Sequence, residues 1–339
     1  MKNQLALLGG EKTVDVVKPY ISIGNQEKIA VNEVLDSNCL SGFYGSWTKE
    51  FFGGEKIKVL ENKWKKLFGV RNAVSVNSNT SGLFCAMGAI GISPGDEVII
   101  PPTTMSATAM APLVYGGIPV FADIENKTYC IDPVKVEEKI NKNTKAIIAV
   151  NLFGHPAQLK KLKNIAKKYN IYLIEDNAQA PLALENGKYC GTVGDIGVFS
   201  LNYHKHIHSG EGGICCTNNN ELALRMQLIR NHAEASVEFT GLKDITNMIG
   251  YNYRMTELSA AIAIVQLRNI KKHVELRKRL SEKLSTYVSN LPGLTPPSIR
   301  KGCSHVYYGW VLDYDEKKIG IKRDLFVKAL NAEGFPCYG

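Results

Sequence analysis

The chain has 339 residues, 45% hydrophobic and 22% charged, a composition typical of a globular protein with about two domains. No apolar run approaches the roughly 18 residues of a membrane span, and the N-terminus lacks a signal-peptide pattern. The net charge of +9 suits an anionic small substrate, whereas lysines without interleaved aromatics argue against nucleic-acid binding. Eight scattered cysteines without zinc-site spacing indicate reduced thiols and a cytoplasmic location.

Residues 1–70 predict an N-terminal arm. Helical spacing over Gln26–Leu35 is followed by an irregular stretch, 37–54, that is rich in glycine and aromatic residues. A second helix is expected over Glu55–Phe68. The aromatic residues of the irregular stretch could line a pocket, form an oligomer interface or pack locally, and the sequence leaves these alternatives open.

From Ala73 onward, predicted strands and helices alternate. The expected strands are 73–77, 97–101, 119–123, 146–152 and 171–176, and the expected helices are 81–91, one from Ser106, 133–140 and 159–169. This alternation favours an α/β fold with a mostly parallel sheet and helices on both faces.

A long amphipathic helix is predicted from Thr256, which has the position of an N-cap. A strand over Val306–Tyr314 and a helix over Arg323–Asn331 should begin a small α/β domain. We therefore expect a large domain with its arm over 1–250 and a linking helix with a small domain over 251–339. The small domain is expected to be incomplete at its end.

Lys205 lies between two apolar runs, Ile196–Phe199 and Ile214–Cys216, that predict buried strands. Burial would lower the pKa of its amine and free the neutral nucleophile that carbonyl chemistry needs. Asp176 ends another apolar strand, at the edge of an α/β sheet where carboxylates point into the ligand crevice. A Schiff-base lysine and an aspartate that keeps a pyridine nitrogen protonated are what a pyridoxal 5'-phosphate (PLP) site requires.

Several motifs around this pair resemble one family. They are DNAQA at 176–180, GDIGVFS at 194–200, Lys205, and GEGG at 210–213. This pattern is similar to the signature of the DegT/StrS family of PLP-dependent sugar aminotransferases. The resemblance implies fold type I, PLP as the cofactor, and a smaller C-terminal α/β domain.

The resemblance also implies a phosphate site for PLP. The turn that contains Asn79 and Thr80 precedes a predicted helix, whose first amides suit a phosphate dianion. Asn79 replaces a glycine that the family has, and Ser200 matches a serine that binds the same phosphate. Asn252 matches a residue that reaches the cofactor of the neighbouring subunit, which implies a homodimer with shared active sites.

Two further residues are expected beside the cofactor ring. Gln179 matches a family glutamine near the ring and its phenolic oxygen. Met105 stands where the family usually has an aromatic residue over the pyridine ring. A thioether can still make favourable contacts with an aromatic ring.

Histidines at 204, 206 and 208 alternate around Lys205, which would suit a metal site only if other ligands joined them. No carboxylate or cysteine completes a set nearby, so no metal is expected. Some relatives carry histidine in place of the Schiff-base lysine and dehydrate keto-sugars. Counting from Ser200 and back from Gly210 places Lys205 at the key position, which favours transamination.

The family resemblance implies L-glutamate or L-glutamine as the amino donor and a keto-sugar, most often linked to a nucleoside diphosphate, as the acceptor. The opening 5–10 also resembles a subgroup that aminates keto-cyclitols such as scyllo-inosose. A PLP-dependent sugar dehydratase and a non-catalytic PLP-binding homologue are the remaining alternatives.

Overall fold

The computed structural model describes residues 4–15 and 17–339, which form two compact units. The larger unit comprises 24–279 and 298–309, and the smaller comprises 1–23, 280–297 and 310–339, apart from the residues outside the described ranges. The sequence predicts a domain boundary at residue 250, between a large cofactor-binding domain and a small domain. This boundary stays a prediction. None of the described helices is both long enough and apolar enough to cross a membrane.

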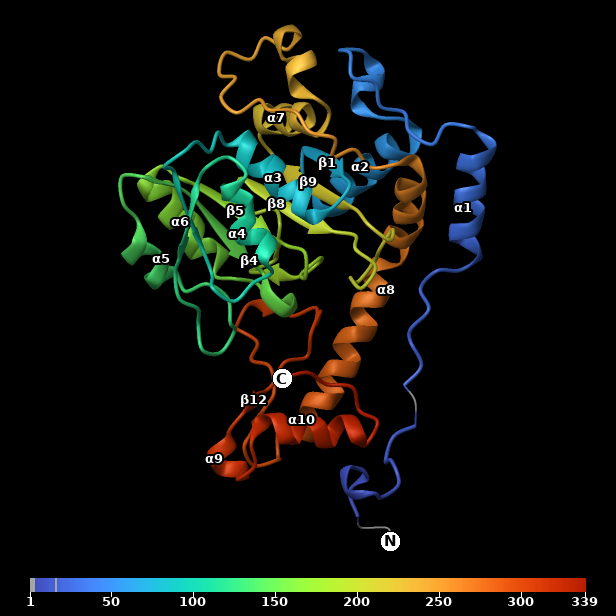
Figure 1. Cartoon of the computed structure of the whole chain (residues 1–339), viewed down its shortest axis with the longest axis vertical. Helices are drawn as coiled ribbons and strands as arrows, with labels where there is room; N and C mark the ends of the chain where they lie inside the picture. Colours follow the sequence, from blue (N-terminus) through green and yellow to red (C-terminus); the bar gives the residue numbers. More distant parts are fainter. Residues whose placement is uncertain (1–3, 16) are drawn as a thin grey trace. The chain divides into compact units, whose positions relative to one another are not determined.

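The described elements follow the order expected from the sequence for most of the chain (Figure 1). The helices are α1 (Asn25–Asp36), α2 (Glu55–Phe68), α3 (Asn79–Ala89), α4 (Ser106–Leu113), α5 (Pro133–Lys139), α6 (Leu159–Tyr169), α7 (Asn220–Arg230), α8 (Glu257–Val288), α9 (Glu316–Ile319) and α10 (Arg323–Ala332). The strands are β1 (Asn72–Val76), β2 (Glu97–Ile100), β3 (Ile118–Phe121), β4 (Thr144–Val150), β5 (Tyr172–Asp176), β6 (Leu184–Glu185), β7 (Lys188–Tyr189), β8 (Ile196–Ser200), β9 (Gly213–Thr217), β10 (Leu294–Thr295), β11 (Cys303–Ser304) and β12 (Asp313–Tyr314).

The larger unit is built on a seven-stranded sheet with the order β1-β9-β8-β5-β4-β2-β3. The neighbours from β3 to β8 pair in parallel, and β9 runs antiparallel to both β8 and β1. The expected mostly parallel sheet is therefore confirmed, with β9 as the exception. Strands β8 and β9 are buried throughout, since parallel-type sheets of α/β proteins are covered on both faces.

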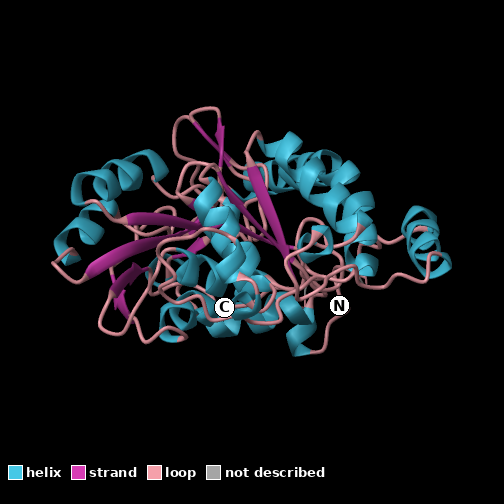
Figure 2. Ribbon diagram, turned by 90° about the horizontal axis from the view of Figure 1, so that it is seen from above, coloured by secondary structure: helices cyan, strands magenta, loops and turns pink. Residues whose placement is uncertain are grey.

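Helices cover the sheet on both sides (Figure 2). One apolar cluster joins α2, α6 and α8 to side chains such as Ile99 and Leu173, and a second joins α3, α4 and α7 to Val98 and Ile174. Neighbouring strand residues thus enter opposite clusters, as the period of two in a strand requires. Helix α2 buries Ile57, Leu60, Trp64 and Phe68, a helical stripe that ends at Gly69 in the left-handed conformation.

The N-terminus of α8 agrees with the expected cap. The Thr256 hydroxyl accepts a hydrogen bond from the Ser259 amide at 3.2 Å. In the next position, the Glu257 carboxylate accepts one from the Lys56 amide at 2.7 Å, in the first turn of α2. The first turn of α8 therefore also provides a hydrogen-bond acceptor for a backbone amide in the first turn of α2.

Two expectations about elements need correction. The strand predicted over Val306–Tyr314 is wrong, because only Asp313–Tyr314 forms a strand there, and the Val306 amide donates to the Gly154 carbonyl at the end of η3 (Leu152–Gly154) in the larger unit. Helix α7 was not anticipated. It begins at an Asn219 cap and contributes several buried apolar side chains to the second cluster.

The smaller unit contains η1 (Ala6–Leu8), part of α8, α9, α10 and the two-stranded β10–β12 ladder. Glu333 after α10 joins this helix to the N-terminal segment, because its carboxylate accepts hydrogen bonds from the amides of Ala6 and Thr13.

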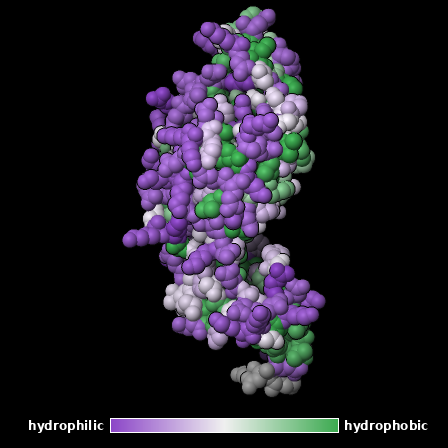
Figure 3. Space-filling model, turned by 90° about the vertical axis from the view of Figure 1, so that its left-hand side faces the viewer, coloured by the Kyte–Doolittle hydropathy of each residue, from purple (hydrophilic) through white to green (hydrophobic). Residues whose placement is uncertain are grey.

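The surface seen in Figure 3 is mostly hydrophilic with scattered apolar side chains.

The seating of α3 on the sheet generates a stability prediction. A methyl group on Gly82 would lie 2.5 Å from Val198 Cγ1 on β8 and 3.0 Å from Cys215 Sγ on β9. We expect Gly82→Ala to lower the free energy of unfolding by about 1–3 kcal/mol, because a buried helix would have to move off the sheet. Chemical denaturation measures this change. The matched control is Gly45→Ala, where a methyl group meets no atom within 4 Å, and an equal loss in both variants would contradict the prediction.

Candidate active site

Asp176 is the last residue of β5, which lies inside the sheet between β4 and β8. Its side chain is 4% exposed. The apolar run before it forms a buried strand, so the carboxylate emerges at the carboxyl edge of the sheet, where open α/β folds bind ligands.

Three donors surround the Asp176 carboxylate. Asn79 Nδ2 lies 3.3 Å from Oδ1, the Ala178 amide donates to the same oxygen at 3.2 Å, and the Thr108 hydroxyl donates to Oδ2 at 3.1 Å. Burial raises the pKa of this carboxyl group, while these hydrogen bonds and the nearby charge of Lys205 act to lower it. The donors from α3 and α4 orient the carboxylate from two helices.

Lys205 lies on the loop between β8 and β9. The Leu201 amide donates to Gly212 and the Ser209 amide donates to Leu201, which closes the loop at its base. The Lys205 side chain is partly buried, and its amine is close enough to Asp176 for the two charges to interact. Burial lowers the pKa of the Lys205 amine and the Asp176 charge raises it, with the net shift downward. A larger share of neutral amine is therefore available for reaction with a carbonyl.

The ends of β8 and β9 meet the start of α3. Ser200 pairs with Gly213, and a methyl group on Gly213 would lie 2.6 Å from the Ser78 carbonyl and 2.8 Å from the Asn79 amide nitrogen. The Ser78 hydroxyl caps α3 by accepting a hydrogen bond from the Ser81 amide at 3.0 Å. Asn79 and Thr80 are the first two residues of α3, so their amides have no acceptor within the helix and could serve a ligand. This corner has the donors and the helix dipole that an anion requires.

Gln179 follows Asp176 by three residues, and Met105 precedes the helix α4 that carries Thr108. Gln179 Oε1 accepts a hydrogen bond from the Phe153 amide at 2.6 Å, which fixes its side chain. Met105 directly precedes α4 and is 70% exposed, and its carbonyl accepts from the Thr108 amide. The thioether thus presents an open apolar surface next to the helix that carries Thr108.

Asn252 lies at the surface of the chain. Its backbone bridges to Asn231, and its carbonyl accepts a hydrogen bond from Asn77 Nδ2 at 3.4 Å. Arg254 Nη1 donates to Asn231 Oδ1 at 2.8 Å. The backbone of Asn252 is therefore anchored near the end of β1, while the residue is exposed.

Asn79 contacts Asp176 directly, and Lys205 is near enough to Asp176 for their charges to interact. Ser200 is brought toward the start of α3 by its strand partner Gly213, which packs on Ser78 and Asn79. Sequence reasoning missed two residues at this site. Thr108 holds Asp176, and the Tyr308 ring lies over Lys205. Thr108 lies in the segment with Met105, three residues further on, so its helical spacing was an available signal. Tyr308 had no such signal.

The three histidines of the loop have different surroundings. His206 is buried, its Nε2 lies 2.8 Å from the Val306 carbonyl, and burial lowers its pKa to about 3. His204 is exposed. Among the residues that the structure describes, no cluster of histidine, cysteine or carboxylate side chains could hold a metal ion.

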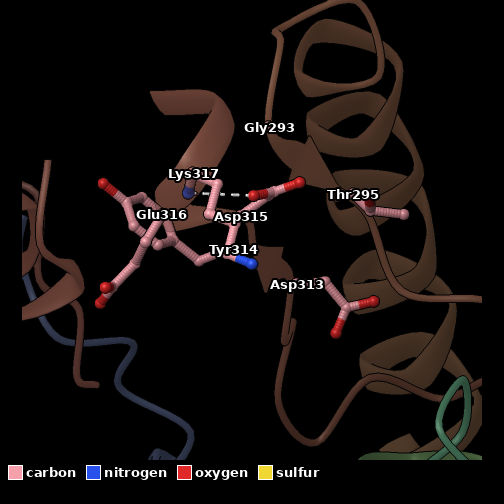
Figure 4. Close-up of a pocket in the computed structure, with 7 residues that line it drawn as sticks. All are labelled: Gly293, Thr295, Asp313, Tyr314, Asp315, Glu316 and Lys317. Carbon is pink, nitrogen blue, oxygen red and sulfur yellow. Dashed lines mark hydrogen bonds between the residues drawn. The ribbon is translucent and has the colours of Figure 1, made fainter. Parts of the chain in front are cut away.

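A separate pocket lies within the smaller unit (Figure 4). It is lined by Gly293, Thr295, Asp313, Tyr314, Asp315, Glu316 and Lys317. Asp315 uses its carboxylate to cap α9 by accepting from the amides of Lys317 and Lys318. The pocket contains none of the residues predicted to bind PLP.

The raised pKa of Asp176 generates a prediction about stability. A carboxyl group whose folded-state pKa is raised stabilises the fold when protonated, and this contribution is lost as pH rises above about 4 through the folded-state pKa. Asp176→Asn removes the charge but keeps a side chain that can accept and donate. In protein freed of bound small molecules, the free energy of unfolding of Asp176→Asn minus that of the wild type should therefore increase with pH.

Urea denaturation between about pH 4 and pH 8 measures this difference. Exposed Asp324 provides the control, and Asp324→Asn should change the free energy of unfolding by less than about 0.5 kcal/mol at any pH. A difference for Asp176→Asn that stays constant or falls with pH would contradict the assigned direction.

Comparison with known proteins identifies the family of the chain. The model of the DegT/DnrJ/EryC1/StrS aminotransferase family matches residues 23–337. GDP-perosamine synthase of Vibrio cholerae is 33% identical over 298 residues, which cover 87% of this chain and 76% of that protein.

Solved structures share the fold. DesI in the presence of its TDP-sugar product has a TM-score of 0.86 at 28% identity, covering 98% of this chain and 81% of the other. E. coli GDP-4-keto-6-deoxy-D-mannose-3-dehydratase with bound hydrated PLP has a TM-score of 0.84 at 28% identity, covering 96% and 85%. The chain therefore belongs to the DegT/DnrJ/EryC1/StrS family of PLP-dependent sugar aminotransferases.

Proposed function

We propose that this PLP-dependent aminotransferase moves an amino group from L-glutamate or L-glutamine to a keto-sugar linked to a nucleoside diphosphate. The observation that carries the proposal is the electrostatic pairing of a partly buried lysine, Lys205, with a buried carboxylate, Asp176. These residues have the chemistry that the cofactor needs at its aldehyde and at its ring nitrogen.

The surrounding side chains fit PLP. Asn79 Oδ1 is buried and has no hydrogen-bond partner in the described part of the chain, so a polar group of a ligand could satisfy it. We assign the phosphate to the amides of Asn79 and Thr80 and the hydroxyl of Ser200. Gln179 and Met105 are assigned to the neighbourhood of the ring.

PLP supplies an electron sink for the carbanion that forms at the amino donor's α-carbon. Asp176 would keep a proton on the ring nitrogen, because a buried carboxylate strongly favours a positive charge beside it. Lys205 Nζ would take the proton from the donor's α-carbon and pass it to the neighbouring cofactor carbon, and it would run the reverse transfer toward the acceptor in the second half. This role requires the neutral amine, which burial makes more abundant by lowering the pKa of Lys205.

Lysine at 205 favours transamination over sugar dehydration. The E. coli dehydratase has the same fold at 28% identity, so the fold alone does not separate the two reactions. Relatives that dehydrate carry histidine in place of the lysine. Here His206 is held by the Val306 carbonyl, and burial keeps its imidazole neutral by lowering its pKa.

The acceptor is assigned from charge and from a relative's name. A net charge of +9 suits a pyrophosphate group, and GDP-perosamine synthase of Vibrio cholerae is named for a nucleotide-linked sugar. The resemblance of residues 5–10 to keto-cyclitol aminotransferases keeps scyllo-inosose as the second candidate. A cytoplasmic location, where both donors and nucleotide sugars are found, stays part of the proposal.

We further propose a homodimer with shared active sites. The support is the exposed position of Asn252 on a firmly anchored backbone. An asparagine held in this way can reach into the site of a second copy and supply a donor to the cofactor phosphate there.

Lys205→Ala should lower amino transfer by about 1,000-fold or more and remove the visible absorption of the lysine-bound cofactor. Lys135→Ala, at an exposed position on α5, should retain both properties and serves as the control. Amino transfer is measured with glutamate and glutamine as donors and with nucleotide-linked keto-sugars or scyllo-inosose as acceptors. Unimpaired transfer by Lys205→Ala would refute the assignment.

The products of the same assays separate the alternatives. An amino-sugar product supports the proposal, an amino-cyclitol moves it to the second acceptor, and a deoxy-sugar without an amino group indicates a dehydratase. A visible band that glutamate and glutamine both leave unchanged would indicate a non-catalytic homologue.

Mixing Lys205→Ala with Asn252→Ala, which should each be strongly impaired as homodimers, tests the shared site. In a heterodimer of Lys205→Ala and Asn252→Ala, one site has the wild-type lysine and the wild-type asparagine, and the other has neither. Random exchange of subunits should therefore restore about a quarter of the wild-type activity. Absence of recovery after verified exchange would show that Asn252 does not act across subunits.

A further inference from the structure

The Tyr308 ring contacts the amine on which the proposed function rests. Lys205 Nζ lies 4.2 Å from the centre of this ring, within the roughly 6 Å range of a cation–π interaction. Tyr308 comes from the segment 298–309, which packs in the larger unit with Lys205. The roles assigned above do not use it.

Backbone contacts fix the position of Tyr308. The Val306 amide donates to the Gly154 carbonyl at 2.9 Å, and the Gly309 amide donates to the Phe153 carbonyl at 3.2 Å. Gly154 has a φ of +100°, and a methyl group there would lie 2.9 Å from the Tyr308 amide nitrogen. Only glycine permits this approach, so the ring is placed by a close contact between two backbones.

The groups that face the Lys205 amine come from several elements. Asp176 on β5 attracts its positive charge. The rings of His204 and His206 lie 6.1 and 6.4 Å from the Tyr308 ring, and burial lowers the pKa of both imidazoles. Arg277 on α8 lies near enough to Tyr308 for its charge to act on the phenol. A positive amine in this setting has two favourable neighbours, the Asp176 carboxylate and the face of the Tyr308 ring.

We propose that Tyr308 is a positioning residue whose ring holds the Lys205 ammonium group beside Asp176 whenever this amine is not joined to the cofactor. The amine would leave the cofactor carbon in the first half of the reaction, move protons while it is free, and rejoin that carbon only at the end of the second half. A fixed aromatic face keeps the charged amine within reach and replaces the water that burial removes. This inference rests on the proposed role of Lys205.

Amine labelling of cofactor-free protein tests the ring directly. Reaction of Lys205 with acetic anhydride, followed by mass spectrometry as a function of pH, reports the fraction of neutral amine. Tyr308→Leu loses the cation–π stabilisation of the ammonium group, so Lys205 should be labelled roughly two- to five-fold faster near pH 7. Tyr308→Phe keeps the ring and should match the wild type.

Other results overturn the proposal. Slower labelling of Lys205 in Tyr308→Leu would show that the ring only excludes water from the amine. Unchanged labelling would show that the ring has no effect on the amine. A change in Tyr308→Phe equal to that in Tyr308→Leu would assign the effect to the hydroxyl group. The matched control is Tyr169→Leu, which removes a surface ring 4.8 Å from Lys168 Nζ and should leave Lys205 labelling unchanged.

A measurement on the wild-type chain covers the case in which Tyr308→Leu does not fold. In cofactor-free protein with isotope-labelled lysine, the Cε resonance of Lys205 should be shifted upfield by the ring current and should disappear in Lys205→Arg. An unshifted resonance contradicts the proposal. Because neither measurement depends on turnover, failure here remains distinct from failure of the aminotransferase assignment, which Lys205→Ala tests.

Discussion

Two opposite charges that are largely withdrawn from water lie in the candidate active site, where each acts on the other. Burial raises the pKa of Asp176 and lowers that of Lys205, so each charge is costly alone and is favoured by the other. The fold offsets this cost with donors from Asn79, Thr108 and the Ala178 amide. These groups come from distant parts of the chain, so the pair exists only when the sheet and both helices are assembled.

Close packing of backbone positions these groups. Glycine 213 lets β9 approach the first residues of α3, and Gly82 lets the same helix rest on β8 and β9. Gly154 in turn admits the segment that carries Tyr308. At each of these three positions, a side chain larger than that of glycine would prevent the close approach of the two segments. The backbone is therefore closely packed beside the proposed phosphate position and beside Tyr308, whereas Met105 is open to solvent.

The site also illustrates a conflict between stability and activity. A carboxylate that is buried without its ligand destabilises the protein, yet this burial gives Asp176 its strong effect on a nearby cation. His206 is buried without a charge, in contrast to Asp176. It is buried as a neutral ring on a backbone carbonyl and serves packing, although it lies next to Lys205 in sequence.

The sequence by itself determined the α/β alternation, the helix bounds of α2 and α6 and the family, and it selected Lys205 as the candidate lysine, because periodicity and motif spacing are local properties. It did not determine that the segment after residue 305 packs on Gly154 in place of forming the expected strand, that β9 runs antiparallel, or that Thr108 contacts Asp176 and Tyr308 contacts Lys205. Only the tertiary structure decided these points, since they depend on which distant backbones can approach one another, and no local pattern encodes that distance.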